Sequence, residues 1–282
     1  MLPCLLAGYA KHRGRNVVNL LISLLLLAIM LLPIIWAINF SLKPPSEQYS
    51  LTSIFSTNYT FENYRKALYP AFVRYILNSM LVSVGTALLA LVISLFAAYA
   101  FSRLRFWGRQ PIFLGILLSQ LIPITIIIIP VYQVLKALHL IDSYFGLILA
   151  YLTFTVPVSI WMLKGFFDNI PMEIEEAATI DGCLKCSAFF RIVLPISKPG
   201  ITATVVWIII ASWQEMIYAL TVMTSKEMRT IAVGILDFFG QWTIDYPTLF
   251  AGAILVSVPI VVLFVFLQRY FVAGLAEGAV KG

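Results

Sequence analysis

The sequence comprises 282 residues, of which 61% are hydrophobic and 11% are charged, and its mean hydropathy is +0.95. Because charged residues make up about 25% of an ordinary soluble domain, this composition predicts an integral membrane protein. The formal net charge is +6, but no cluster of lysine and arginine is interleaved with aromatic residues, which argues against nucleic-acid binding. The basic excess is better explained as charge that orients the chain in a membrane.

Residues 1–16 contain three basic side chains and are predicted to form a short cytoplasmic tail. The charge-free run 17–38 is long enough to cross a bilayer core of about 30 Å at about 1.5 Å per residue. This run is too long for a secretory signal and lacks a small-residue cleavage site, so we expect an uncleaved first transmembrane helix. Residues 39–74 are polar and predict an ordered extracytoplasmic loop with a short helix around 62–68.

A second charge-free run, 75–102, predicts the second span. Within it, Ala90, Ser94 and Ala98 form a small-residue stripe that would allow another helix to approach closely in lipid. A compact basic loop follows, with Arg103, Arg105 and Arg109.

The third predicted span, 110–135, contains two prolines, Pro123 and Pro130. Proline in a membrane helix frees backbone carbonyls that neighbouring helices or a water-lined cavity must satisfy, so we expect a kink there. Gln120 lies near the expected kink and is a polar candidate for a translocation path. Residues 132–142 are predicted to form a short interfacial segment on the outer side.

The fourth predicted span covers residues 143–163, contains Pro157 and ends at Lys164. After a polar interruption, residues 201–222 predict a fifth span, and residues 223–245 predict a second outer loop. The charge-free run 246–268 predicts the sixth span, and Arg269 begins a short tail. The expected organisation is therefore a tail at 1–16, a six-helix transmembrane domain at 17–269 with a loop at 166–199, and a tail at 270–282.

The loop between the fourth and fifth spans begins with a predicted helix. Pro171 is suited to a first turn, because a residue there has no N–H partner to lose. Three glutamates follow in the first turns, where the positive end of the helix dipole favours them. Four small or apolar residues are predicted to lie close to one face of this helix, namely Ile174, Ala177, Ala178 and Ile180.

A turn and a second helix complete the predicted loop. Gly182 suits the left-handed conformation that ends a helix. Residues 184–193 predict a second short helix, which Pro195 would stop. Physical reasoning therefore predicts a helix–turn–helix whose first helix has a small-residue face.

The basic residues indicate which side this loop occupies. Six spans place both termini on the same side of the membrane, and that side carries 12 of the 19 basic residues. The positive-inside rule therefore predicts cytoplasmic termini and a cytoplasmic loop. The 12 are Lys11, Arg13, Arg15, Arg103, Arg105, Arg109, Lys164, Lys185, Arg191, Lys198, Arg269 and Lys281.

Three cysteines occur, and Cys183 and Cys186 have the C-x-x-C spacing that redox and zinc sites use. The sequence has no second cysteine pair, and its two histidines, His12 and His139, lie far away in the sequence. We therefore interpret these cysteines as packing or incidental residues, and we expect no disulfide and no metal site.

The loop resembles the EAA loop of bacterial ABC-importer permeases. The matching residues are Glu176-Ala177-Ala178, three residues, Gly182, nine residues and Ile192-Val193-Leu194-Pro195. The resemblance implies an all-α integral membrane protein with six transmembrane helices and the type I importer fold, in which this loop is a coupling helix that docks on a cytoplasmic ATPase. The ATPase-coupling residues implied are Glu175, Glu176, Ala177, Ala178, Asp181, Gly182, Ile192, Leu194 and Pro195.

Further segments resemble the second permease of carbohydrate importers, as in the maltose system. They are Asn78-Ser79, residues 97–101, residues 145–149, and the end of the chain, residues 271–275 and 278–282. In that family the tail reaches between the ATPase subunits, which implies such contacts for Gly278, Ala279, Val280, Lys281 and Gly282. Cys183 and Cys186 depart from the family pattern, in which small or polar residues are more usual.

The chain lacks the motifs that would let it act alone as an enzyme. A P-loop needs G-x-x-x-x-G-K-[ST], and no Gly-Lys pair occurs in the sequence. We therefore expect no enzyme activity and no cofactor in this chain, with ATP and Mg²⁺ held by partner subunits. Glu215 is a carboxylate well inside a predicted span and is by default a functional candidate, the alternatives being a residue in a wet vestibule or one that fixes a helix contact. The expected translocation-path residues are Asn78, Gln120, Trp213, Gln214, Glu215 and Tyr218.

These features predict a permease subunit of a carbohydrate ABC importer in a bacterial inner membrane. Its expected partners are a homologous second permease, two cytoplasmic P-loop ATPase subunits, an extracytoplasmic solute-binding protein and the lipid bilayer. Disaccharides, glucosylglycerol-like solutes and glycerol phosphodiesters are all compatible substrates. The alternatives are an importer of a non-sugar solute, a stand-alone channel or assembly protein, and a membrane enzyme.

Overall fold

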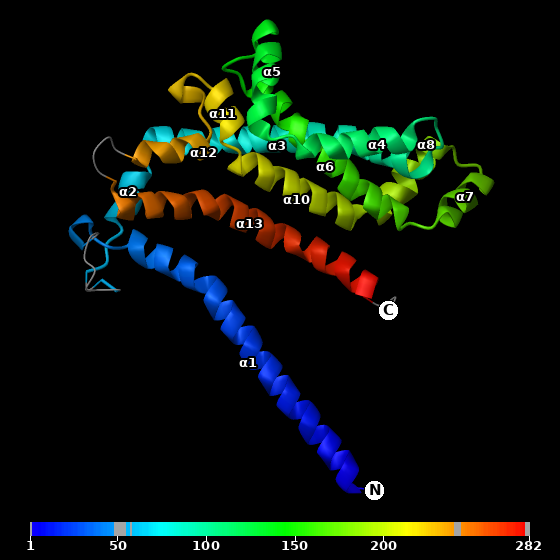
Figure 1. Ribbon diagram of the computed structural model, residues 1–282, viewed down its shortest axis with the longest axis horizontal. Coiled ribbons are helices and arrows are strands. Elements are labelled where there is room, and N and C mark those ends of the chain that lie inside the picture. Colours follow the sequence, from blue (N-terminus) through cyan, green and yellow to red (C-terminus); the bar gives the residue numbers. More distant parts are fainter. Residues whose placement is uncertain (1, 48–54, 57, 240–243, 280–282) are drawn as a thin grey trace. The chain divides into compact units, whose positions relative to one another are not determined.

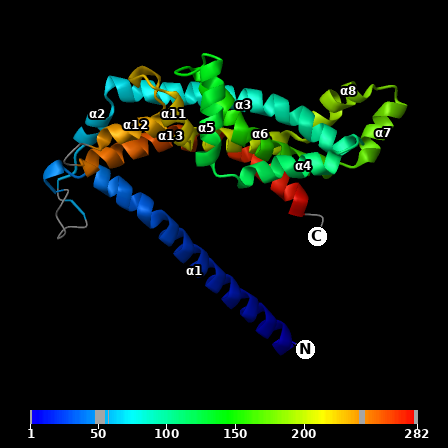
Figure 2. The ribbon, with the colours of Figure 1, turned by 45° about the horizontal axis from the view of Figure 1, so that its top comes forward.

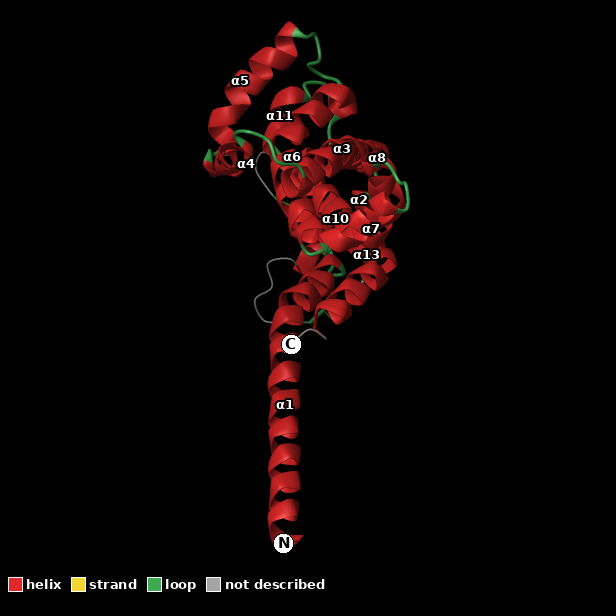
Figure 3. Ribbon diagram, turned by 90° about the vertical axis from the view of Figure 1, so that its right-hand side faces the viewer, coloured by secondary structure: helices red, strands yellow, loops and turns green. Residues whose placement is uncertain are grey.

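The structure is a computed structural model that describes residues 2–47, 55–56, 58–239 and 244–279, with the backbone alone described at 2–18 and 269–279. Within these residues the regular elements are all helices, apart from a single bridge between Phe239 and Ile244 (Figure 3). The predicted all-α class is confirmed.

Among the described residues, four helical segments are long and apolar enough to cross a membrane: Asn19–Ser41, Pro70–Arg103, Tyr144–Asp168 and Tyr246–Gln268. Two bent pairs raise the number to six if each counts as one span. They are Arg109–Leu121 with Ile124–Ala137, bent by 104°, and Lys185–Ile196 with Lys198–Gln214, bent by 76°. The structure is therefore compatible with four to six spans, and six were predicted.

The chain divides into two compact units, and the first comprises residues 1–68 and 238–255. It holds α1 (Leu2–Ser41), η1 (Pro45–Glu47), α2 (Glu62–Ala67) and the first part of α13 (Tyr246–Ala279). Trp36 of α1 contacts Phe250 of α13 at 5.3 Å between ring centroids. The amide of Asn63 in α2 donates to the carbonyls of Ser41 and Lys43, at 2.8 and 2.7 Å. The predicted short helix around 62–68 is thus confirmed and is tied to the end of α1.

The described parts of both predicted tails are helical. α1 begins at Leu2 and so includes residues 2–16, and no proline lies between positions 4 and 32 to interrupt it. Likewise, α13 continues past Gln268 to Ala279.

The second unit comprises residues 69–237 and 256–282. Its centre is formed by α3 (Pro70–Arg103), α6 (Tyr144–Asp168) and α10 (Lys198–Gln214), which pack side by side (Figure 1). The predicted small-residue stripe on α3 lies in this packing, because Ala90, Ser94 and Ala98 are all fully buried. The hydroxyl of Ser94 donates to the carbonyl of Val156 on α6 at 3.4 Å, so the two backbones approach closely there.

The third predicted span is sharply bent. α4 (Arg109–Leu118) and η2 (Ser119–Leu121) end before Pro123, and α5 (Ile124–Ala137) begins after it. A proline disfavours helical backbone in the residue before it, and Ile122 is accordingly extended. Pro130 lies inside α5 without ending it, and α5 continues to Ala137. The first six residues of the predicted interfacial segment 132–142 therefore belong to α5.

The fifth predicted span is interrupted, contrary to the expected continuous helix over 201–222. α10 ends at Gln214 and a short helix, α11 (Ile217–Val222), follows the extended residue Glu215. The chain then forms η4 (Lys226–Met228), α12 (Ile231–Gly234) and η5 (Ile235–Phe238).

The polar loop between α6 and α10 contains α7 (Met172–Ile180), α8 (Lys185–Ala188), the π-helix η3 (Phe189–Val193) and α9 (Leu194–Ile196). α7 and α8 lie beyond the C-terminal end of α3, at the opposite end of this unit from α12 (Figure 2). The loop is therefore the terminal feature of one end of the bundle.

Candidate functional site

The first helix of the loop forms as predicted. Pro171 is the N-cap of α7, and two acidic residues, Glu173 and Glu175, lie in its first turn. Gly182 has a φ of +86°, the left-handed conformation that glycine adopts without strain. The amide of Cys183 donates to the carbonyl of Ala178 at 2.9 Å, which closes the turn after α7.

The second helix does not end where predicted. Pro195 lies in the first turn of α9, and the helix continues to Ile196 instead of stopping before the proline. The wider π-helical turn at Phe189–Val193 precedes it. Proline has no N–H to donate and its ring crowds the preceding turn, so a locally widened helix accommodates it.

The apolar residues of α7 do not share one face. Ala178 is buried, whereas Ile180 is 86% exposed, so the predicted grouping of these two residues is wrong. Leu184, in the turn between α7 and α8, is 78% exposed. Glu176 and Asp181 are exposed beside them. The tip of the loop therefore presents large apolar side chains next to carboxylates.

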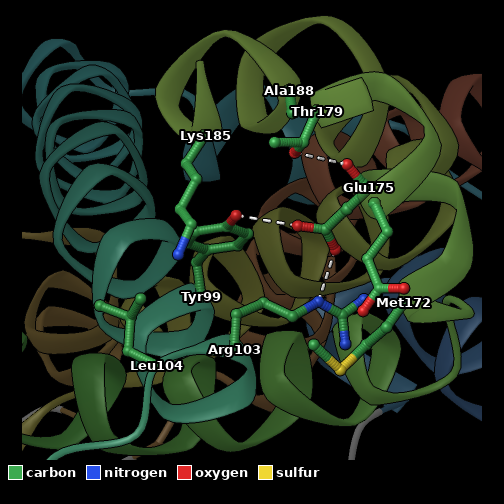
Figure 4. Close-up of a pocket in the computed structure, with 9 residues that line it drawn as sticks. Tyr99, Arg103, Leu104, Met172, Glu175, Thr179, Lys185 and Ala188 are labelled. Atoms are coloured by element: carbon green, nitrogen blue, oxygen red, sulfur yellow. Dashed lines mark hydrogen bonds and ion pairs between the residues drawn. The ribbon is translucent and has the colours of Figure 1, made fainter. Parts of the chain in front are cut away.

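Glu175 points the other way and forms the centre of a polar cluster (Figure 4). Its carboxylate accepts from the Arg103 guanidinium at 2.5 Å and from the Tyr99 hydroxyl at 2.8 Å. A second nitrogen of Arg103 donates to the carbonyl of Ile170 at 2.8 Å. The Arg103 and Glu175 side chains are only 7% and 13% exposed. They line a cavity of about 170 Å³ together with Tyr99, Thr179 and Lys185.

The structure thus separates the predicted coupling residues into two sets. Glu176, Ala177, Asp181, Gly182 and Pro195 are exposed, whereas Glu175, Ala178, Ile192 and Leu194 are buried or half-buried. Sequence reasoning missed Arg103 and Tyr99, because Arg103 was interpreted only as membrane-orienting charge. Residues 97–101 resemble the family, but no local pattern indicates this contact, since the partner Glu175 lies 72 positions after Arg103.

A second cavity, of about 230 Å³, lies at the break between η2 and α5. It brings together two predicted path residues, Gln120 and Tyr218, with Thr153 and Phe154 of α6. The rings of Phe154 and Tyr218 are nearly parallel, at 9°, with centroids 6.3 Å apart. The hydroxyls of Thr153 and Tyr218 are 3.1 Å apart. Sequence reasoning missed Thr153 and Phe154. They lie within the charge-free run of α6, where nothing in the sequence distinguishes them from their neighbours.

Of the other path candidates near this cavity, Glu215 has a clear structural contact. The two carboxylate oxygens of Glu215 accept from the amides of Tyr218 and Ala219, at 3.0 and 3.2 Å, so Glu215 caps α11. Trp213 is buried in the protein and Gln214 is exposed.

Asn78 lies near the N-terminal end of α3 and does not line this cavity. Its amide donates to the carbonyls of Glu227 and Arg229, both at 2.8 Å, and accepts from the Tyr144 hydroxyl at 2.7 Å. The structure therefore places Asn78 as an anchor for residues 227–229.

Asp142 fixes the same end of the unit between α5 and α6. Its carboxylate accepts from the amides of Thr224 and Ser225, both at 3.0 Å, and from the Ser225 hydroxyl at 3.1 Å. Burial raises the pKa of Asp142, but the hydrogen bonds from Ser225 and Thr224 outweigh it and hold the pKa below its ordinary value. Nearby, burial and the carboxylate of Asp237 raise the pKa of Tyr69, whose hydroxyl donates to that carboxylate at 3.1 Å.

The predicted ATPase-contacting tail is described only in part. Gly278 and Ala279 belong to α13, whereas Val280, Lys281 and Gly282 lie outside the described residues.

Comparisons with known proteins agree on one family. Residues 90–277 match the family model described as binding-protein-dependent transport system inner membrane component. The chain is 36% identical over 255 residues to the trehalose transport system permease protein of Mycobacterium tuberculosis, covering 89% of this chain and 93% of that protein. It is 34% identical over 282 residues to the galactooligosaccharides transport system permease protein of Bacillus subtilis, covering 97% and 99%.

A solved structure shows the same fold. It is a chain of a bacterial ABC transporter involved in the import of the acidic polysaccharide alginate, with a TM-score of 0.78 at 19% identity and coverage of 92% of this chain and 97% of that one. The family assignment rests on the match over residues 90–277 and on the relatives at 34–36% identity. The chain belongs to the family of binding-protein-dependent transport system inner membrane components.

Proposed function

We propose that this chain is a permease subunit of an ABC importer for a sugar or sugar-like solute. Similar proteins are named as transport system permeases for trehalose, galactooligosaccharides and sulfoquinovosyl glycerol. The observation that carries the coupling role is the tip of the loop, where Ile180 and Leu184 are exposed beside Glu176 and Asp181. Large apolar side chains exposed together outside the apolar spans are typical of a surface that a partner covers.

The proposed partner at this surface is a cytoplasmic P-loop ATPase, one of two in the complex, which would hold ATP and Mg²⁺. Ile180 and Leu184 would enter an apolar cleft on the ATPase, and Glu176 and Asp181 would face basic residues at its rim. Interfaces combine a desolvated apolar centre with a polar edge in this way. The tail at 278–282 would add a second contact with the ATPases.

The cavity around Gln120 and Tyr218 is the proposed contribution of this chain to the translocation path. A parallel aromatic pair offers an apolar face to a sugar ring, and the amide and hydroxyl groups of Gln120 and Thr153 suit sugar hydroxyls. We propose Gln120 and Phe154 as contacts with the solute, with Tyr218, which is only 1% exposed, stacked on Phe154, and a structural role for Glu215 and Asn78. A homologous second permease would complete the path.

A solute-binding protein is the proposed outer partner. The alginate importer was also solved in complex with an alginate pentasaccharide-bound periplasmic protein. A chain of that structure matches this one with a TM-score of 0.61. In this proposal both termini and the α7 loop are cytoplasmic, in a bacterial inner membrane. Residues 138–143 and 223–230 would then face the binding protein.

The test is co-purification of the tagged chain in mild detergent, followed by identification of the recovered proteins. The double substitution Ile180→Glu with Leu184→Glu should reduce recovery of a P-loop ATPase by at least about tenfold, as expected when two central interface residues are lost. The matched control, Ile180→Val with Leu184→Val, keeps the surface apolar and should recover the ATPase at the native level.

Equal ATPase recovery with the glutamate and valine variants would contradict docking at α7. Recovery of the native chain alone, from membranes in which it is folded, would contradict the importer assignment. The solute is identified by uptake of a radiolabelled panel that includes trehalose, galactooligosaccharides and glycosylglycerols, in cells with and without the chain.

A further inference from the structure

The helix at the tip of the loop is held to the rest of the unit by little apolar burial. α7 has nine residues, of which only Ala178 is buried. Met172, Ile174 and Ile180 are all exposed. A helix this short is not stable by itself, so specific contacts with other elements must fix its position.

Those contacts converge on Glu175. Tyr99 and Arg103 are one turn apart on α3, so they project from the same face of that helix, and both reach the two oxygens of this one carboxylate. Arg103 also holds the carbonyl of Ile170, immediately before α7 begins. The last turn of α3 therefore binds both the start of α7 and its first turn (Figure 4).

The surroundings of this cluster make the Glu175–Arg103 ion pair hard to break. The Tyr99 ring packs on Phe189 at 4.6 Å and on Phe167 at 6.2 Å between centroids, which excludes water from one side of the ion pair. Removing one partner from such a pair leaves an uncompensated, poorly solvated charge, which is far more costly than losing an exposed pair. Glu175 and Arg103 should therefore stay together when α7 is pushed or pulled.

We propose that the cluster of Glu175, Arg103 and Tyr99 is the mechanical link that makes α7 and the last turn of α3 move as one body. Glu175 is then a positioning residue that does not contact the ATPase, whereas its neighbour Glu176 does. This inference rests on the proposed function, because α7 must have a partner that moves it.

The packing of α3 defines where such a movement goes. Ala98 and Phe101 of α3 pack with Ile160, Leu163 and Phe167 of α6 in one buried cluster. α6 carries Thr153 and Phe154 into the cavity at the helix break. A displacement of α7 would therefore reach one wall of the proposed translocation path through two packed helices.

A second polar contact at the same turn supplies a matched control. The Ser102 hydroxyl donates to Asp168 at 2.7 Å, so it joins α3 to the end of α6 but does not touch α7. Ser102→Ala removes this contact, together with a longer one of 3.4 Å from the Arg103 guanidinium to the Ser102 hydroxyl, and leaves both donors to Glu175 in place.

The anchoring is measured first on the purified full-length chain by amide hydrogen exchange. Exchange across residues 172–180 should be at least about tenfold faster in Glu175→Gln and in Arg103→Gln than in the native chain, because opening of a locally anchored segment becomes easier. The charge-swapped pair Arg103→Glu with Glu175→Arg can re-form the ion pair but loses the hydrogen bonds to the Ile170 carbonyl and from the Tyr99 hydroxyl, so its exchange should fall between the native and the single-variant rates. Native exchange rates in the two single variants would overturn the inference.

The transmission is measured on the complex assembled with its ATPase and second permease. A reporter cysteine, Ile127→Cys, lines the cavity in a chain whose cysteines Cys4, Cys183 and Cys186 are replaced by serine. Its labelling by a hydrophilic maleimide is compared without nucleotide and with ATP plus orthovanadate.

In Glu175→Gln and Arg103→Gln the ATPase should remain bound, but the nucleotide-dependent change in labelling should fall by about fivefold or more, as expected when a coupling free energy is lost. Ser102→Ala should behave like the parent, and the charge-swapped pair should keep more of the change in labelling than either single variant. Single variants that keep the full change in labelling would overturn the inference. Loss of the ATPase from Glu175→Gln to the extent expected for Ile180→Glu with Leu184→Glu would also overturn it. A parent complex that lacks the ATPase or shows no change would refute the proposed function instead, and hydrogen exchange would then decide the anchoring alone.

Discussion

Gly146, at the start of α6, lies against the preceding backbone. A Cβ built on Gly146 would lie 2.0 Å from the carbonyl oxygen of Leu140 and 3.0 Å from the Ser143 hydroxyl. Ser143 is the N-cap of α6 and accepts from the Gly146 amide at 3.0 Å. The missing side chain therefore allows the loop to fold over the helix start and to cap it.

Replacing Gly146 with alanine should destabilise the protein, because the clashing atom belongs to the backbone and cannot rotate away. We expect a cost of about 1–3 kcal/mol, as for other overpacked sites. Thermal unfolding in detergent, followed by intrinsic fluorescence, measures the change.

Gly165→Ala is the matched control, because Gly165 lies in the same helix and an added Cβ meets nothing within 4 Å. Alanine there should be neutral or stabilising by up to about 1 kcal/mol, since it favours helix. Equal unfolding temperatures for the two variants would contradict the predicted clash.

At the scale of elements, the bundle end opposite α7 is closed by polar contacts across the sequence. Asp142, between α5 and α6, holds the loop after α11 through Thr224 and Ser225. Its backbone has a φ of +58°, and its amide donates to the carbonyl of Val222 at 2.9 Å. The two helices that border the cavity, α5 and α11, are thus joined at this end.

The lowered pKa of Asp142 predicts a pH dependence of stability. A carboxyl whose pKa is lower in the folded protein stabilises it fully above the ordinary carboxyl pKa of about 4, and this stabilisation is lost as the pH falls through the lowered pKa. Asp142→Asn should cost about 1 kcal/mol at pH 7, allowing for solvent screening, and should flatten the loss of stability below about pH 4.

Thermal unfolding between pH 7 and pH 3 checks this expectation. Ser225→Ala removes one of the three donors to Asp142 and should have an intermediate effect. If the Asp142→Asn profile parallels that of the native protein throughout, the hydrogen-bonded carboxylate contributes nothing to the acid response.

At the scale of the whole molecule, the proposed function and the basic residues together predict one orientation in the membrane. The α7 loop carries Cys183 and the exposed Cys186, whereas the exposed Lys226 lies in η4 at the other end of the same unit. If the loop meets a cytoplasmic ATPase, these two ends face opposite compartments.

Labelling with a membrane-impermeant maleimide tests this orientation. The native cysteines should react only after the membrane is permeabilised. A Lys226→Cys variant in a background with serine at positions 4, 183 and 186 should react in intact spheroplasts. Labelling of the native chain without permeabilisation would reverse the assigned orientation.

Much of this architecture follows from the sequence alone, because it depends on local properties. Charge-free runs indicate which segments can leave water, and they coincide with the long helices of the structure. Pro171 marks the start of α7 because proline restricts its own backbone. Gly182 marks the end because glycine can adopt the left-handed conformation, whatever surrounds it. The EAA spacing identified the family for the same reason, since it lies within one continuous loop.

Only the tertiary structure decides what the individual side chains do. Glu175 and Glu176 are adjacent and chemically identical, yet one is buried against Arg103 and the other is exposed. Glu215 lies within an apolar run, yet it caps a helix that begins at the break it helps to form. In each case the outcome depends on groups brought near by packing, often from far along the chain, and no local pattern in the sequence records them.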